Sequence, residues 1–388
     1  MPSQDAVNGI KFDFNSGLRI YFPENEKNQY HLQFFDNDSN LLLYDADVKN
    51  GTVMSSVKKY YINYHFIITD KNTKKIIFEH YFNLKNKKVI VQFPVGTLGD
   101  SLGWFSYVER FQKKTQCNLI LCVSQFLIDI VKKQYPNYKY ISKEQVKDQN
   151  SYACYYLGLF FKNDRNFQPV DFRQVGLHKT AGMILGLRTK EELEDEPVRL
   201  DLSAERKIKD KYVVIATKAS SQAKFWNNPH GWYDVINFLK ENGYRVICID
   251  KNVVYGTGMV YNYLPWGVEN ETGDKPLQER IDLIKDADFF IGLSSGLTWL
   301  AWCCKIPVVM ISGFSLPKNE FYTPYRVINY QVCNGCWDDL TEEFDHGDFL
   351  WCPKHKNDNQ QFECTKTITS AQVINVIKQI PNFKPKKK

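Results

Sequence analysis

Four cysteines in the last quarter of the chain have the spacing of a metal site. They are a C-x-x-C pair and two later single cysteines, namely Cys333, Cys336, Cys352 and Cys364. The segment around them is polar and without helical or strand period, and four thiolates in tetrahedral geometry suit zinc or iron. A site with no open position indicates a structural role, and the strand–turn–helix context of a redox pair is missing. His346 and His355 are spare candidate ligands in the same segment.

An aspartate lies inside a glycine-rich loop. Asp100 falls within residues 94–103, where three glycines allow close backbone approach. The spacing differs from the dinucleotide-binding fingerprint G-x-G-x-x-G. A carboxylate in this loop is a candidate general base for an acceptor hydroxyl. The alternative is an aspartate that only caps the following helix, which is expected to begin near Trp104.

Two further loops carry groups that suit an anion. Lys224, with Ser220 and Ser221, has the charge and the donors to hold a phosphate, although a lone lysine in a polar loop is normally only solvated. Residues 288–314 read as a buried strand, a small-residue turn, a helix and a second buried strand. Ser294 or Ser295 would cap this helix, and free N–H groups at its start would attract a nucleotide diphosphate. An ordinary crossover with a capping serine is the alternative.

The elements that must position these loops divide the chain into three parts. Residues 1–86 alternate between apolar and polar side chains and break at turn residues, which predicts an N-terminal β-rich barrel or sandwich domain. Strands then alternate with helices in two runs, residues 87–205 and 206–388, with an acidic linker near residues 189–207. Two successive α/β domains enclose a cleft at the C-terminal ends of their strands. The predicted ligand loops are therefore residues 94–103, 217–230 and 292–297.

Composition narrows the class of protein. The chain of 388 residues is 43% hydrophobic and 24% charged, as in a globular protein. It has no apolar run long enough for a membrane span and no signal-like N-terminus, so we expect a cytoplasmic protein without membrane insertion. The net charge of +6 is modest and no module for nucleic acid is visible, so nucleic-acid binding is not expected. The remaining cysteines lie in apolar runs, which argues against a disulfide framework.

The three loops and the cysteines together resemble the bacterial autotransporter heptosyltransferases. These are protein O-heptosyltransferases related to the lipopolysaccharide heptosyltransferases of glycosyltransferase family 9. The resemblance covers nearly the whole chain. Its specific stretches are FPVGTLGDSLGWF (93–105), QAKFWNN (222–228), FFIGLSSGLTWLAW (289–302), IPVVMISGFSLPKNEFYTP (306–324) and CNGCWDDL with the two later cysteines. The cysteine set separates this subfamily from the lipopolysaccharide enzymes.

The resemblance implies an α/β protein with a GT-B fold of two Rossmann-like domains. The N-terminal β-rich domain, a four-cysteine metal knuckle at residues 333–364 and a C-terminal helix would be added to that fold. The implied reaction is an inverting transfer of heptose from ADP-heptose to serine hydroxyls of an autotransporter adhesin passenger domain. No catalytic divalent metal is implied, and members of the family form large homo-oligomers, described as dodecamers.

The resemblance also implies roles for single residues. The base of the family falls on Asp100, and its donor-phosphate lysine falls on Lys224. From the composition of the loops we add Thr97 and Gly99 as support for the base, and Ser220, Ser294, Ser295, Gly296 and Thr298 as donor-binding residues. The cysteines at positions 333, 336, 352 and 364 would hold iron, where their spacing alone favours zinc.

One run departs from the wider family 9 pattern. Its D-T-G-x-x-H becomes S-S-G-L-T-W at residues 294–299, which removes an acid and a histidine and leaves Trp299 in the place of the histidine. The backbone groups of the helix N-terminus are unaffected. Two other functions stay open, a lipopolysaccharide-core heptosyltransferase and a non-catalytic, metal-braced scaffold that binds an adhesin. The cysteine segment and the β-rich N-terminus disfavour the first, and the second predicts no release of ADP.

Overall fold

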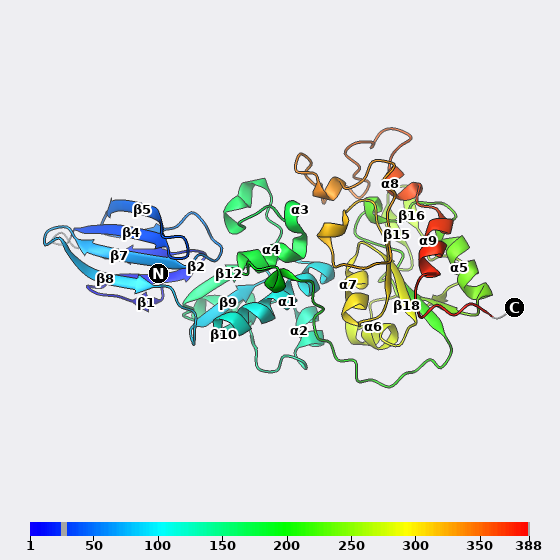
Figure 1. Ribbon diagram of the computed structural model, residues 1–388, viewed down its shortest axis with the longest axis horizontal. Coiled ribbons are helices and arrows are strands. Elements are labelled where there is room, and N and C mark those ends of the chain that lie inside the picture. Colours follow the sequence, from blue (N-terminus) through cyan, green and yellow to red (C-terminus); the bar gives the residue numbers. More distant parts are fainter. Residues whose placement is uncertain (25–28, 387–388) are drawn as a thin grey trace.

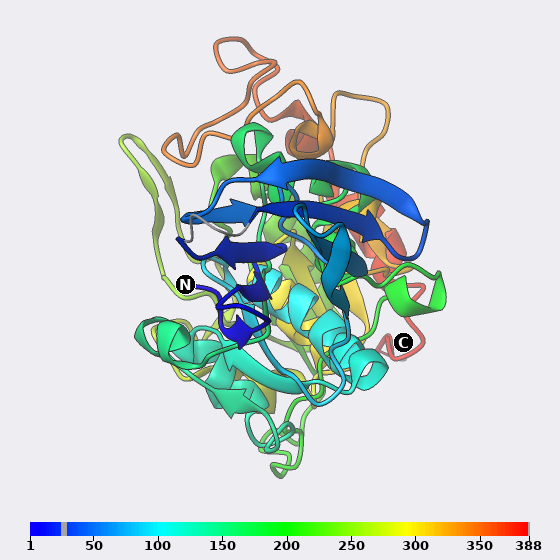
Figure 2. The ribbon, with the colours of Figure 1, turned by 90° about the vertical axis from the view of Figure 1, so that its left-hand side faces the viewer.

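The computed structural model describes residues 1–24 and 29–386. It places an N-terminal part (described residues up to 86), a first α/β part (87–205) and a second α/β part (206–386) one after another along the longest axis (Figure 1). Viewed from the N-terminal end, the N-terminal sheets lie in front, and the long loops of residues 330–360 rise to one side (Figure 2). Among the described residues, no helix combines the length and the apolar character needed to cross a bilayer.

The N-terminal part consists of two facing sheets and not of a closed barrel. Its four-stranded antiparallel sheet has the order β5-β4-β7-β8 and packs on β2 and β3 through aromatic rings. The rings of Phe12 and Phe66 lie 5.4 Å apart, and those of Phe14 and Tyr64 lie 5.9 Å apart. Alternate residues of β4 and β7 are buried, as in strands with one face on the core. The strands are β1 (Gln4–Asp5), β2 (Lys11–Asn15), β3 (Arg19–Phe22), β4 (Tyr30–Asp36), β5 (Leu41–Val48), β6 (Thr52–Ser55), β7 (Tyr64–Asp70) and β8 (Lys75–Tyr81).

The N-terminal part shares a sheet with the first α/β part. Strand β2 pairs in parallel with β12 (Ala153–Tyr156), so that Ala153 lies opposite Phe14. The resulting eight-stranded sheet has the order β11-β10-β9-β12-β2-β3-β6, with β1 on β2. Within this one continuous sheet, the strand pairs formed before residue 86 are antiparallel, and every pair that includes a later strand is parallel. The other parallel strands are β9 (Lys88–Gln92), β10 (Asn118–Cys122) and β11 (Lys139–Tyr140).

A buried carboxylate stabilises this junction. Asp13 on β2 has no exposed surface. Its oxygens accept hydrogen bonds from the Arg19 guanidinium at 2.7 and 2.6 Å and from the Asn15 side chain at 2.8 Å. The Asn15 amide also donates to the carbonyl of Ser151, just before β12, at 3.0 Å. The ion pair therefore fixes β2 and β3 to the start of β12.

Helices of the first α/β part cover its parallel strands. The helix after β9 begins at Leu98, earlier than the expected start near Trp104, because Thr97 and Asp100 cap it and Gly99 is accommodated in its first turn. Residues 194–211, which include most of the expected linker, have no helix or strand and run along the outside of both α/β parts. The helices are α1 (Leu98–Thr115), α2 (Gln125–Val131), α3 (Phe172–Val175) and α4 (Leu177–Ile184).

The second α/β part has a six-stranded parallel sheet with the order β17-β14-β13-β18-β19-β20. Strands β13, β18 and β19 are apolar and completely buried, as expected for strands covered on both faces. The parallel strands of the two α/β parts confirm the predicted α/β class. The strands are β13 (Tyr212–Ile215), β14 (Arg245–Cys248), β17 (Glu269–Asn270), β18 (Phe289–Leu293), β19 (Val308–Ile311) and β20 (Arg326–Val327), with a hairpin of β15 (Tyr255–Thr257) and β16 (Val260–Asn262). The helices are α5 (Gly231–Glu241), α6 (Leu277–Ile284), α7 (Gly296–Cys303), α8 (Glu363–Lys366) and α9 (Ser370–Ile377).

The junction of the sheets gives a test of stability. Asp13→Ala is expected to lower the free energy of unfolding by about 3 kcal/mol, because the partly buried Arg19 loses its partner. Asp5→Ala removes a carboxylate that is 81% exposed and paired with Lys11, and it is expected to cost less than about 0.5 kcal/mol. Urea denaturation of both variants measures the difference. Equal midpoints would show that the Asp13 ion pair contributes nothing to the junction.

Candidate active site

A cavity of about 750 Å³ lies between the two α/β parts. This volume suits a ligand of the size of a sugar nucleotide. The cavity is lined by residues from all three loops predicted from the sequence and by further segments of both α/β parts. The predicted residues in its wall are Thr97, Gly99, Asp100, Ser220, Lys224, Ser294, Ser295 and Gly296.

Two helix N-termini from different parts of the chain meet at this cavity. The first residues of α1 and α7 touch, because Gly99 and Gly296 have no side chains to separate them. A Cβ atom on Gly296 would lie 2.9 Å from the Cβ atom of Leu98 and 3.0 Å from the backbone nitrogen of Gly99. Both helices direct unpaired N–H groups and the positive ends of their dipoles toward the cavity. The wall is therefore suited to an anion.

Trp299 closes the contact between the two helices. It is 3% exposed, and a Cβ atom on Gly99 would lie 3.0 Å from its ring. The ring also packs edge-on to His178 on α4, with centroids 5.4 Å apart. Trp299 thus packs the second α/β part against the first.

Asp100 both caps helix α1 and faces the cavity, which are the two roles that the sequence left as alternatives. It lies in the first turn of α1, where its Oδ2 accepts hydrogen bonds from the backbone N–H and the hydroxyl of Thr97, both at 2.9 Å. Its carboxyl group also lines the cavity, and within the described chain Oδ1 has no hydrogen-bond donor. One oxygen caps the helix, which leaves the other available to a ligand.

Lys224 ends a short 3-10 turn after β13. Its ammonium lies over the rings of Phe314, Trp337 and Phe344, at 5.5, 5.4 and 6.0 Å from their centroids. Desolvation lowers the pKa of Lys224, and the carboxylates of Asp100 and Glu320 oppose that shift. No side chain of residues 1–24 or 29–386 forms an ion pair or hydrogen bond with this ammonium. A desolvated cation held only by aromatic faces favours an incoming anion.

The turn before α7 is held by a buried polar network. The hydroxyl of Ser294 bonds to the hydroxyl of Ser315 at 2.8 Å and to the carboxylate of Glu320. Glu320, 4% exposed, forms an ion pair with Arg326 at 2.8 Å. Thr298, a predicted donor contact, is absent from the cavity wall because its hydroxyl donates to the carbonyl of Leu293 at 2.6 Å.

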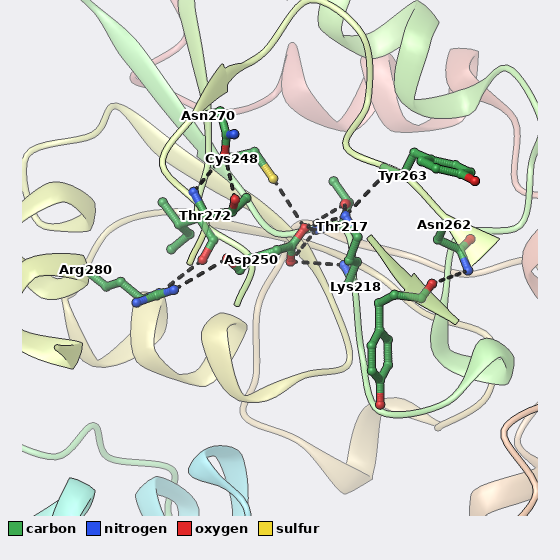
Figure 3. Close-up of polar contacts among 11 residues, drawn as sticks. Thr217, Lys218, Cys248, Asp250, Asn262, Tyr263, Asn270, Thr272 and Arg280 are labelled. Carbon is green, nitrogen blue, oxygen red and sulfur yellow. Dashed lines mark hydrogen bonds and ion pairs between the residues drawn. The ribbon is translucent and has the colours of Figure 1, made fainter. Parts of the chain in front are cut away.

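A second polar network near the cavity was missed by the sequence analysis (Figure 3). Asp250, 1% exposed, accepts hydrogen bonds from the backbone N–H groups of Thr217 and Lys218, and the Lys218 ammonium lies 3.5 Å away. Arg280 on α6 donates to backbone carbonyls, including that of Gly273 at 2.6 Å. Lys218, Asp250 and Arg280 all line the cavity. Asp250 closely follows a buried strand, and this position was the signal that could have revealed it.

Residues 333–364 are here called the metal segment. Its four cysteines lie close enough to affect one another's ionisation. Burial and the other three thiols raise the pKa of Cys364 to about 12, and burial with the thiols of Cys352 and Cys333 raises that of Cys336 to about 11. Neighbouring thiols resist ionisation unless a cation is present, and thiolates are ligands of thiophilic metals. Among the described residues, the metal-ligating atoms that lie within 4.8 Å of one another are those of Cys333, His355 and Glu363, a group that includes one of the four cysteines.

The metal segment also forms part of the cavity wall. Backbone hydrogen bonds join Gly335 to Gly313 at 2.8 Å and Trp337 to Phe314 at 3.1 Å, just after β19. These bonds place Trp337, Phe344 and His346 in the wall. His346, a spare ligand candidate from the sequence, therefore faces the cavity.

Comparisons with known proteins agree with this architecture. Residues 7–72 match the profile of the N-terminal domain of glycosyltransferase TibC, and residues 173–343 match glycosyltransferase family 9 (heptosyltransferase). Autotransporter heptosyltransferase Aah of Escherichia coli is 49% identical over 383 residues, which cover 99% of this chain and 96% of Aah.

Solved structures of TibC have the same fold. The crystal structure of this iron-containing dodecameric glycosyltransferase from enterotoxigenic E. coli H10407 has a TM-score of 0.93 and 49% identity, over 98% of this chain and 97% of TibC. A second structure holds TibC in complex with ADP-D-beta-D-heptose. BimC of Burkholderia thailandensis, an inactive autotransporter heptosyltransferase, is 33% identical over 99% of this chain and 88% of BimC. The chain belongs to the autotransporter heptosyltransferase family, whose fold is that of an α/β glycosyltransferase.

Proposed function

We propose that this chain is an active heptosyltransferase that transfers heptose from ADP-heptose to serine hydroxyls of an autotransporter adhesin. The main support is the cavity, in which a carboxylate, an unpaired ammonium and two helix N-termini converge from loops far apart in the sequence. The complex of TibC with ADP-D-beta-D-heptose supports the donor, and the names of the relatives support the acceptor. Because the family includes the inactive member BimC, membership alone does not establish activity. The proposal that this chain is active therefore rests on the cavity.

The proposed reaction is a single displacement with inversion. The acceptor hydroxyl attacks the anomeric carbon while Asp100 accepts its proton, and the bond from that carbon to the phosphate oxygen breaks. The charge that develops on the leaving ADP is stabilised by Lys224 and by backbone N–H groups near Ser295 and Gly296. Ser220 and Ser294 would complete the donor site, and Thr97 and Gly99 would fix the base. These groups contribute positive charge toward the diphosphate, and the proposed reaction includes no catalytic divalent cation.

We further propose that the metal segment holds iron through its four cysteines. TibC contains iron. In this chain, burial and the neighbouring thiols raise the pKa of Cys364, and a bound cation would favour its thiolate form. Its role would be structural, because it would fix Trp337 and Phe344 around Lys224. Assembly into a large homo-oligomer is proposed on the example of dodecameric TibC. The cytoplasmic location and the domain boundaries at residues 86 and 205 stay predictions.

The role of Asp100 can be tested by Asp100→Asn. The amide oxygen still accepts the hydrogen bonds of Thr97 but no longer takes a proton, so we expect the transfer rate to fall by about 10²- to 10⁴-fold while ADP-heptose affinity changes little. Asp148→Asn, at an exposed site in the same part, is the control. Initial rates and the intact mass of a coexpressed adhesin fragment, read as heptosyl steps, measure the effect. Transfer at the wild-type rate would leave Asp100 as a helix cap only.

The ligands of the metal can be distinguished by substitution. Cys336→Ser is expected to abolish stoichiometric iron and to lower the unfolding midpoint, because a four-thiolate site cannot close without it. His355→Gln and Glu363→Gln are expected to retain iron, and Cys122→Ser, on β10, is the control for loss of a thiol. Metal analysis of the purified variants provides the measurement. Iron retained by Cys336→Ser but lost with His355→Gln would assign the ion to the Cys333, His355 and Glu363 group.

A further inference from the structure

His346 is a histidine of the metal segment that lies apart from the metal ligands. The atoms of His355 lie close to Cys333 and Glu363, whereas His346 lines the cavity together with Asp100 and Lys224. Neither the proposed transfer nor the proposed iron site uses it. Its position in the wall suggests a role toward the ligand of the cavity.

Aromatic packing orients His346 beside Lys224. The imidazole is perpendicular to the ring of Phe344 with centroids 4.7 Å apart, and it also meets the edge of Phe161 at 6.3 Å. The ammonium of Lys224 lies over the same Phe344 ring. Within the described chain, neither ring nitrogen of His346 has a hydrogen-bond partner. Both nitrogens are therefore available to a ligand that also contacts Lys224.

Burial and the neighbouring ammonium disfavour the charged form of His346 in the absence of a ligand. Burial and the Lys224 ammonium lower the pKa of His346, against the carboxylates of Asp345 and Asp100. A diphosphate beside Lys224 would reverse this balance, because negative charge favours the imidazolium form. Proton uptake on binding is the consequence.

The other cations of the wall are already occupied. Lys218 lies 3.5 Å from Asp250, and Arg280 donates to backbone carbonyls of residues 249, 273 and 275. Lys251 and Lys275, which also line the cavity, form ion pairs with Asp274 and Glu271. A sugar nucleotide carries a negative charge on each phosphate, which is more than Lys224 alone neutralises. Uncompensated charge in a partly buried site is costly, so a second cation next to Lys224 has a clear function.

We propose that His346 is a diphosphate ligand that binds beside Lys224 and takes up a proton from solvent as the nucleotide enters. This inference rests on the proposed function, since it requires a nucleoside diphosphate donor. The proton acquired by His346 stays on the imidazole while the anomeric bond breaks, and it returns to solvent when ADP leaves. The proton of the acceptor hydroxyl goes separately to Asp100. The metal segment would thereby contribute a binding group as well as a brace.

Calorimetry of ADP binding to the intact, iron-loaded protein tests this proposal. Titrations at neutral pH in two buffers of different ionisation enthalpy give the number of protons taken up per ADP. We expect the wild type to take up more protons than His346→Gln, and the variant to bind ADP about 10- to 100-fold more weakly, as for loss of a charge-assisted hydrogen bond. Adenosine, which has no phosphate, should bind both proteins equally. His230→Gln, at an exposed histidine of the same part and outside the cavity wall, should behave as the wild type.

A second variant separates charge from folding. His346→Arg carries a permanent cation and is expected to keep ADP affinity near that of the wild type while losing the extra proton uptake. Wild-type affinity and proton stoichiometry in His346→Gln would overturn this inference alone. Failure of the wild type to bind ADP would overturn both this inference and the proposed donor.

Discussion

The contact between the first turns of α1 and α7 is the constraint on which the site depends. Gly99 and Gly296 let the two helix N-termini meet, and a methyl group on either would meet atoms of the opposite part at 3.0 Å or less. Trp299 fills the space beside them and also contacts α4 through His178. Because the two helices follow strands of different sheets, this contact brings the positive ends of both helix dipoles to the same cavity.

The metal segment extends this constraint to the cation of the site. Lys224 has no carboxylate partner in the described chain, and its ammonium is held by Phe314, Trp337 and Phe344. Trp337 directly follows Cys336, so the fold of the cysteine segment and the surroundings of the lysine are coupled. An aromatic enclosure leaves the positive charge uncompensated until an anion enters, whereas a salt bridge would have to break first.

The sequence predicts the class of fold and three loops that contribute to the cavity wall, since apolar parallel strands and the small-residue loops after them have distinct patterns. Other features lay beyond it, among them the network around Asp250. Helix α1 begins at Leu98 because the Thr97 and Asp100 cap outweighs the glycines, and Thr298 turns its hydroxyl to a local carbonyl. His346 shows no periodicity or spacing that separates a cavity residue from a metal ligand. The start of α1 and the orientation of Thr298 are set by hydrogen bonds between near neighbours in the chain. The position of His346 depends on long-range packing, which only the tertiary structure reveals.

The continuous eight-stranded sheet has a mechanical consequence. Strands β2, β3 and β6 belong to the N-terminal part, yet their hydrogen bonds continue those of β12 and β9, and Asp13 fastens the seam. Among the described residues, the strands of the N-terminal part are thus joined by backbone hydrogen bonds to the sheet on which helix α1 and its Asp100 pack. A rotation of the first α/β part relative to the second would therefore carry the N-terminal sheets with it, and a macromolecule bound to those sheets would move together with the proposed base.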